Sequence, residues 1–235
     1  MRDADSDELT PPTAERVQRR ALALSAMVCR GFLEQDAGAQ EAEAFRGRLL
    51  DWLRQHGVAD ELEPSELAFL DAELGSADPQ AVVNATWRAE GVGVLAWALG
   101  RFELTPHDVP LDPKAAADAV GFLAEAIEPE PRLRASDELT TQSEILFATH
   151  WRIRDHSLNR GSLDFAEFAR TCWFGPLVIT GLPLAEGDLA VGGRSIAKAE
   201  PQQVGFCLSM ALERHQAIRW VLGWSELYSE IDTST

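Results

Sequence analysis

The sequence predicts a mainly α protein, a single-domain multi-helix bundle with a small β-hairpin element near residues 188–198. Apolar residues recur every three or four positions through most of the 235-residue chain, which is the period of a helix packed on one side. Proline follows a capping aspartate at Asp78-Pro79 and at Asp112-Pro113, as is typical of helix starts. Gly192-Gly193 separates two short apolar runs, which indicates a hairpin turn.

Four helices are expected in the first hundred residues, after a disordered acidic lead over residues 1–12. Val17, Ala21 and Leu24 share one face of the first helix, and glycines end the second and the fourth. The expected helices span about 13–35, a segment through Phe45 and Leu53 that ends near Gly57, 64–74 and 79–100.

Four further helices are expected in the rest of the chain, which with the lead removed forms one helical domain over 13–235. Thr141 with Glu144, and Asp164 with Glu167, have the spacing of capping boxes. The prolines of 128–131 break the helical pattern, so a candidate internal boundary lies near 128–136. The expected helices span about 113–127, 141–158, 164–173 and 201–223.

Composition indicates a soluble protein with a large core. Apolar residues make up 46% of the chain, enough to fold without metals or disulfides. Cys29, Cys172 and Cys207 are odd in number and lie in apolar contexts, so we expect reduced thiols in a cytoplasmic protein. The chain has no apolar segment long enough to span a membrane, and its N-terminus lacks the apolar stretch of a secretory signal.

The formal net charge of −17 limits the partners. Nucleic acids and anionic membranes attract positive surfaces, so we expect neither as a partner. A basic protein partner fits this charge better, although solubility alone would also explain it. Arginine far outnumbers lysine and alanine is abundant, which indicates a GC-rich bacterial genome.

The segment from Trp87 to Gly100 brings two charges into an apolar helix. It begins with Arg88 and Glu90 and continues for ten residues without a charge. A helix that is apolar on every side belongs in the interior, so these charges are either paired for structure or used in chemistry.

Two other helices repeat this feature. Glu213 lies in the middle of an apolar stripe of the last helix, with Arg214 on its flank and His215 on the opposite side. His150 and Arg152 lie among apolar residues of the helix over 141–158. If these helices pack together, one polar cluster forms from Arg88, Glu90, His150, Arg152, Glu213 and Arg214.

The cluster has two interpretations. As a buried salt-bridge network it would fix the packing of the helices, and this is the main hypothesis. As a pocket it would use Glu213 or Glu90 as acid or base and His150 to transfer protons. The anionic ligand would then be bound by arginines and aromatic rings, for which the candidates are Arg88, Arg152, Arg214, Trp87 and Trp151.

Known reaction and metal motifs are missing from the sequence. The five histidines form no metal-binding pattern, so we expect no metal and no cofactor. Gly91-Val92-Gly93 lacks the third glycine of a dinucleotide-binding loop and lies within a helical pattern, so these glycines are expected to permit close helix packing.

The same residues resemble an uncharacterised bacterial family, domain of unknown function 4272. The resemblance implies a single-domain bacterial protein, and it carries no catalytic role over to any residue. It rests on Trp87–Glu90, Leu95–Arg101, His150–Arg154, Gly187–Ala190, Glu213–Trp220 and Tyr228–Glu230.

Two functions follow as hypotheses. The first is a cytoplasmic bacterial interaction or accessory protein without catalysis, for example an immunity-like protein that neutralises a basic toxin through its acidic surface. The alternative is an enzyme or small-molecule binder that uses the Glu/His/Arg cluster to bind an anion. The sequence predicts neither the oligomeric state nor the partner.

Overall fold

The computed structural model describes residues 10–36 and 40–235 and confirms the mainly α fold. Within these residues it contains eight α-helices and one small antiparallel sheet. The expected acidic lead lies outside the described residues except for 10–12. None of the described helices is long and apolar enough to span a membrane.

The helices of the first half begin where capping residues place them. The Thr13 and Asp78 side chains accept hydrogen bonds from the first turns of α1 and α4, as predicted for Asp78-Pro79. The bounds are α1 Ala14–Leu33, α2 Gln40–Gln55, α3 Pro64–Asp71, α4 Pro79–Ala98 and α5 Pro113–Ala119, with 3₁₀ turns η1 Glu34–Asp36 and η2 Ala59–Glu61.

The second half holds two long helices, one short helix and the sheet. Strand β2 pairs with β1 on one side and β3 on the other, and Gly192-Gly193 turns the chain between β2 and β3 with positive φ at both residues. The bounds are α6 Ser136–Asn159, α7 Phe165–Thr171, β1 Leu184–Ala185, β2 Asp188–Val191, β3 Arg194–Ser195, η3 Ile196–Lys198, α8 Pro201–Val221 and η4 Tyr228–Glu230.

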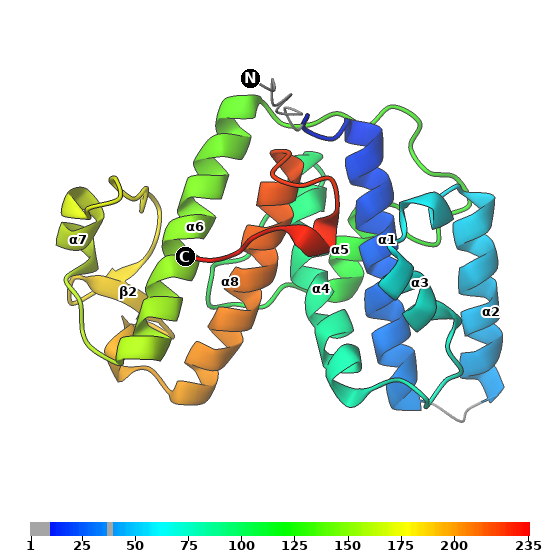
Figure 1. Cartoon of the computed structure of the whole chain (residues 1–235), viewed down its shortest axis with the longest axis horizontal. Helices are drawn as coiled ribbons and strands as arrows, with labels where there is room; N and C mark the ends of the chain where they lie inside the picture. Colours follow the sequence, from blue (N-terminus) through cyan, green and yellow to red (C-terminus); the bar gives the residue numbers. More distant parts are fainter. Residues whose placement is uncertain (1–9, 37–39) are drawn as a thin grey trace, which may run out of the picture.

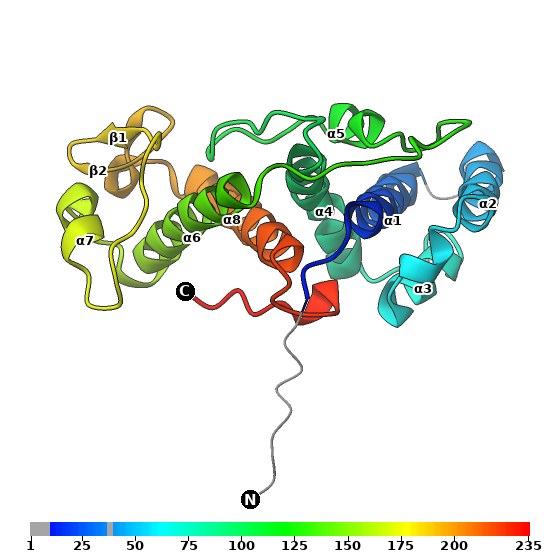
Figure 2. The same ribbon diagram turned by 90° about the horizontal axis from the view of Figure 1, so that it is seen from above.

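Four helices lie side by side in the order α1, α4, α8 and α6 (Figure 1). Helices α2 and α3 lie on the outer side of α1, and α7 with the sheet lies at the α6 end of the molecule (Figure 2). The C-terminal segment passes α8 and ends beside α6 (Figure 1). Helix α8 therefore joins the two ends of the molecule.

Two hydrophobic cores follow from this arrangement. The larger core combines α1 and α4 with the C-terminal half of α8 and the buried Tyr228. The smaller core combines α6, α7, the sheet and the N-terminal half of α8, around Phe165 and Ile153. Cys29, Cys172 and Cys207 are free thiols, and burial raises the pKa of Cys29 and Cys207 to about 11.

Two expectations about the elements are wrong. Helix α5 ends at Ala119 instead of Ile127, because Gly121 adopts a positive φ of 77° and Phe122 N–H bonds back to Ala117 O. Helix α6 begins at Ser136, so Thr141 and Glu144 lie inside it and form no capping box. The small β element near residues 188–198 is confirmed; its hairpin ends at Ser195, and residues 196–198 form a 3₁₀ turn.

Candidate functional site

The six charged residues expected to form one cluster lie in three separate groups. Helices α4 and α8 bring together Arg88, Glu90, Glu213 and Arg214, which we call the ion-pair network. His150 contacts His215 across the interface of α6 and α8. Arg152 points to the sheet on the far side of α6. The prediction of a single cluster is therefore wrong, since successive residues of α6 face different neighbours.

Arg214 is completely satisfied inside the protein. Its Nε donates to Glu90 Oε2 at 2.7 Å, and Glu90 Oε1 also accepts from Leu111 N–H at 3.1 Å. The other guanidinium N–H groups donate to the loop that follows α4, at Thr105 O, Pro106 O, Thr105 Oγ1 and Val109 O. All five donors of this arginine are therefore used, and it fastens the loop to α8.

Arg88 and Glu213 form the second pair of the network. Arg88 Nη1 donates to Glu213 Oε2 at 3.1 Å and to Gln216 Oε1 at 3.2 Å. Burial raises the pKa of Glu213, and the positive charge of Arg88 opposes this change. The Arg88 guanidinium also lies over the Tyr228 ring, 5.3 Å from its centroid.

Gly91 makes room for Tyr228 against α4. A Cβ atom at Gly91 would lie 2.5 Å from the Tyr228 hydroxyl, and one at Gly93 would lie 2.2 Å from Leu111 Cδ2. The prediction of close helix packing is right only in part. Leu24 of α1 lies 3.4 Å from the Cβ position of Gly91, but the groups closest to the two glycines are side chains from the loop after α4 and from η4. Tyr228 therefore packs the C-terminal segment against α4 next to Arg88 of the ion-pair network.

His150 and His215 share one hydrogen bond. Their Nδ1 atoms lie 3.0 Å apart, so one imidazole donates and the other accepts. Burial lowers the pKa of His150 to about 4 and that of His215 to about 3, with Arg219 lowering both further. Both rings are therefore neutral at pH 7, and Nδ1 of His150 is already used.

Arg152 joins α6 to the sheet. It is fully buried, and its Nε and Nη2 donate to the two carboxylate oxygens of Asp188 at 2.7 Å each. Its Nη1 donates to Asp155 Oδ2 at 3.0 Å. One arginine is therefore shared by two carboxylates, and these three residues carry one net negative charge.

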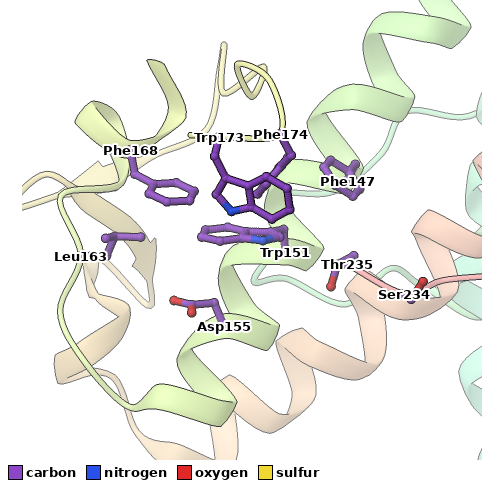
Figure 3. A pocket seen from close by; sticks show the side chains of 9 residues that line it. All are labelled: Phe147, Trp151, Asp155, Leu163, Phe168, Trp173, Phe174, Ser234 and Thr235. Carbon is purple, nitrogen blue, oxygen red and sulfur yellow. The ribbon is translucent and has the colours of Figure 1, made fainter. Parts of the chain in front are cut away.

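That negative charge lies at the largest hollow beside α6, which we call the aromatic cleft. It has a volume of about 570 Å³ and lies between α6, the segments that flank α7 and the C-terminal residues (Figure 3). Among the described residues that line it, Asp155 has the only charged side chain. The lining residues are Phe147, Trp151, Asp155, Leu163, Phe168, Trp173, Phe174, Ser234 and Thr235.

The aromatic rings form a layered wall. The ring of Trp151 stacks on Phe168, with centroids 4.5 Å apart and an interplanar angle of 10°. Trp173 meets Phe174 edge-on at 5.3 Å and is 91% exposed. Asp155 follows Trp151 by one turn of α6, so the carboxylate and the ring face the same hollow (Figure 3).

The sequence identified part of this site. Trp151 lines the cleft, and Arg152 donates a hydrogen bond to Asp155, the carboxylate of the cleft. Trp87 instead packs against Phe206, with ring centroids 6.1 Å apart, and is not among the cleft residues. Asp155 and the aromatic residues after α7 were missed. A residue-by-residue wheel of α6 places Asp155 one turn after Trp151, but nothing in the sequence shows that the segment after α7 returns to this face.

Metal binding has no support in the described part of the chain, which holds no group of three His, Cys, Asp or Glu side chains placed to bind an ion. The paired His150 and His215 belong to no such group of three among the described residues.

The fold and these sites define a mainly α protein with a buried ion-pair network at its centre and an open aromatic cleft at one end. The chain belongs to the family described as Domain of unknown function (DUF4272), which matches residues 3–164. The match includes α4, the ion-pair residues of α4 and the start of the cleft, and it ends before α7. No curated protein and no solved structure matches the chain.

Proposed function

We propose that this protein is a non-catalytic interaction protein that binds a basic segment of a partner protein in its aromatic cleft. One observation carries the proposal. Aromatic rings surround the carboxylate of Asp155, and its ion-pair partner Arg152 is shared with the carboxylate of Asp188. A Lys or Arg side chain placed there gains cation–π contacts with the rings and donates a charge-assisted hydrogen bond to the Asp155 carboxylate.

The charge of the whole chain supports this choice of ligand. A net charge of −17 attracts a basic partner over long range and accelerates its encounter. Trp173 presents a nearly free indole at the mouth of the cleft, the kind of rigid aromatic contact that contributes strongly at protein interfaces. An immunity-like protein that neutralises a basic toxin in the bacterial cytoplasm is one concrete form of this function.

The ion-pair network is less suited to a reaction. Arg214 has no donor left for a ligand, and both oxygens of Glu90 accept hydrogen bonds from the protein. A catalytic acid or base must reach the proton that it transfers, and Glu90 is only 3% exposed. We therefore assign Glu90, Glu213 and Arg214 to structure in this proposal.

The test is a titration of the protein with a synthetic hexapeptide of alternating lysine and glycine, followed by tryptophan fluorescence. A glutamate–glycine peptide of the same length is the charge-reversed control. We expect saturable binding of the lysine peptide only, and Trp173→Ala weakens it roughly threefold to thirtyfold because one cation–π contact is lost. We expect Asp155→Asn to weaken binding of the lysine peptide more than Trp173→Ala does.

Leu158→Ala is the matched control, because Leu158 is 74% exposed on α6 and is not among the cleft residues. This variant binds the peptide like the wild type. Equal binding of both peptides, or a lysine peptide whose affinity is unchanged in Asp155→Asn and Trp173→Ala, would refute the proposal.

A further inference from the structure

A second, smaller cavity adjoins the aromatic cleft and is lined by an arginine as well as a glutamate. It has a volume of about 270 Å³ and shares Phe147 and Phe174 with the cleft. Its remaining walls are mainly apolar, with His215 and Arg219 contributed by α8. The other lining residues are Ser143, Glu144, Gly175, Pro176, Leu177, Val178 and Trp224.

Arg219 brings an unpaired positive charge to this cavity. Its guanidinium stacks on the Trp224 ring at 4.2 Å, and Nη1 donates to the backbone oxygen of Asp232. Within residues 10–36 and 40–235, no carboxylate lies within 4.0 Å of this guanidinium to form an ion pair. The Asp232 carboxylate attracts this guanidinium only from farther away, so the ion-pairing position of Arg219 is available to an anionic ligand.

His215 adds a buried polar atom that has no partner. Its side chain is 0% exposed, and its Nδ1 is used by His150, but Nε2 makes no hydrogen bond among the described residues. An unsatisfied buried nitrogen costs about 1–3 kcal/mol, so it calls for an explanation. A ligand that reaches the floor of the cavity would satisfy this atom.

The charges at the cavity select the class of anion. Burial lowers the pKa of His215 to about 3, so this ring stays neutral near pH 7 and Arg219 supplies the only full positive charge among the lining residues. Glu144, exposed at the rim, disfavours a second negative charge on the ligand. A monoanion therefore fits better than a phosphate dianion.

We propose that the smaller cavity binds the carboxylate of a small apolar acid, held by the Arg219 guanidinium and by an Nε2–H donor of His215. For this, His150 Nδ1–H donates to His215 Nδ1, which leaves the His215 proton on Nε2. The apolar body of the acid packs against Phe147, Leu177 and Val178. The site shares Phe147 and Phe174 with the aromatic cleft but differs from it in its charged residues, and it does not depend on the function proposed for the cleft.

The experiment is an NMR titration of the full chain carrying ¹⁵N-labelled histidines with 3-methylbutanoate. The neutral isostere 3-methylbutanamide and inorganic phosphate are the comparison ligands. We expect a saturable change at the His215 ring nitrogens with the carboxylate and none with the amide or phosphate. No saturable change with 3-methylbutanoate, or an equal change with the amide, overturns the proposal.

Variants at the guanidinium test its role. Arg219→Gln weakens binding of 3-methylbutanoate roughly tenfold to a hundredfold, because a charge-assisted hydrogen bond is lost, while Arg219→Lys keeps part of the affinity. Arg194→Gln is the control, since Arg194 is exposed on β3 away from the cavity. Unchanged affinity in Arg219→Gln contradicts the assignment.

The two proposed ligands can be separated in one variant. Asp155→Asn weakens binding of the lysine peptide and leaves binding of 3-methylbutanoate unchanged, because Asp155 lines only the aromatic cleft. Loss of both ligands in this variant would contradict independent sites. If the wild-type protein binds 3-methylbutanoate but not the lysine peptide, the proposed function is refuted and the proposed carboxylate site is not.

Discussion

The ion-pair network between α4 and α8 and the aromatic cleft beside α6 use charge in opposite ways. In the network, both oxygens of Glu90 and all five donors of Arg214 are hydrogen-bonded within the protein. In the cleft, one buried arginine serves two carboxylates, and Asp155, whose oxygens accept from Arg152 and Asn159, stays 25% exposed at a hollow that a ligand can enter. A buried charge alone therefore does not identify a binding site; a charge that a ligand can reach does.

The largest expected effect is at the network. Glu90→Ala leaves the buried Arg214 charge without its carboxylate and should lower the free energy of unfolding by about 3–5 kcal/mol. Urea denaturation followed by circular dichroism measures this loss. Lys114→Gln removes one partner of an exposed i,i+4 pair with Asp118 and should change stability by less than about 0.5 kcal/mol.

A Glu90→Ala protein as stable as the wild type would break the comparison, since the network would then have no structural role. In that case Glu90 would again be a candidate for chemistry.

The pH dependence of stability tests the paired histidines. Their pKa values, about 4 for His150 and about 3 for His215, lie below the value of about 6.5 in an unfolded chain. The unfolded chain therefore binds protons first, and stability is lost as the pH falls from about 6.5 toward 4. The positive charges of Arg154 and Arg219 add to this effect, whereas Asp232 opposes it.

Between pH 7 and pH 5 the loss should be on the order of 2–4 kcal/mol, measured by urea unfolding at each pH. Glu213 contributes with the opposite sign, because its raised pKa makes protonation favour the folded state. Replacement of His150 by Asn should reduce the slope of stability against pH. A wild-type protein equally stable at pH 7 and pH 5 would mean that the histidines are not buried and neutral.

Glycine substitutions test how tightly the network is packed. Gly91→Ala places a methyl group against the buried Tyr228 hydroxyl and should destabilise the fold by about 1–3 kcal/mol. Gly205→Ala, on an open face of α8, should stabilise it by up to about 1 kcal/mol through helix propensity. Thermal denaturation of the two variants distinguishes packing from propensity, and an equal shift in both would contradict the packing of Tyr228 on α4.

The smallest effect on stability is expected at the cleft. Trp173 is 91% exposed, so Trp173→Ala should change the free energy of unfolding by less than about 0.5 kcal/mol. A larger loss in urea denaturation would show that Trp173 supports the fold and would weaken its assignment to binding.

Local sequence signals predicted most of the helices. They also identified the charged residues of the ion-pair network, but not which of them pair with each other. Proline after a capping aspartate placed the starts of α4 and α5, because this pattern acts within one turn. The apolar stripe around Glu213 correctly indicated a buried, partnered carboxylate. It could not name Arg88 as that partner, since the pairing depends on which helices pack together.

The cleft was harder to predict because it depends on loops. The rings of Trp151 and Phe168 lie seventeen positions apart in the chain, and only the turn between α6 and α7 brings them together. Asp188, at the start of β2, is the main partner of Arg152 for the same reason. Helical periodicity describes one face of one helix, and it carries no information on long-range loop closure.

The most direct test removes one carboxylate charge from each region and measures two properties of both proteins. Glu90→Gln and Asp155→Asn are matched, because each replaces a carboxylate by its amide. We predict that Glu90→Gln loses stability in urea denaturation and keeps its affinity for the lysine–glycine peptide, whereas Asp155→Asn keeps its stability and loses affinity. The reverse pattern, or the same change in both variants, would contradict the division into a structural network and a binding cleft.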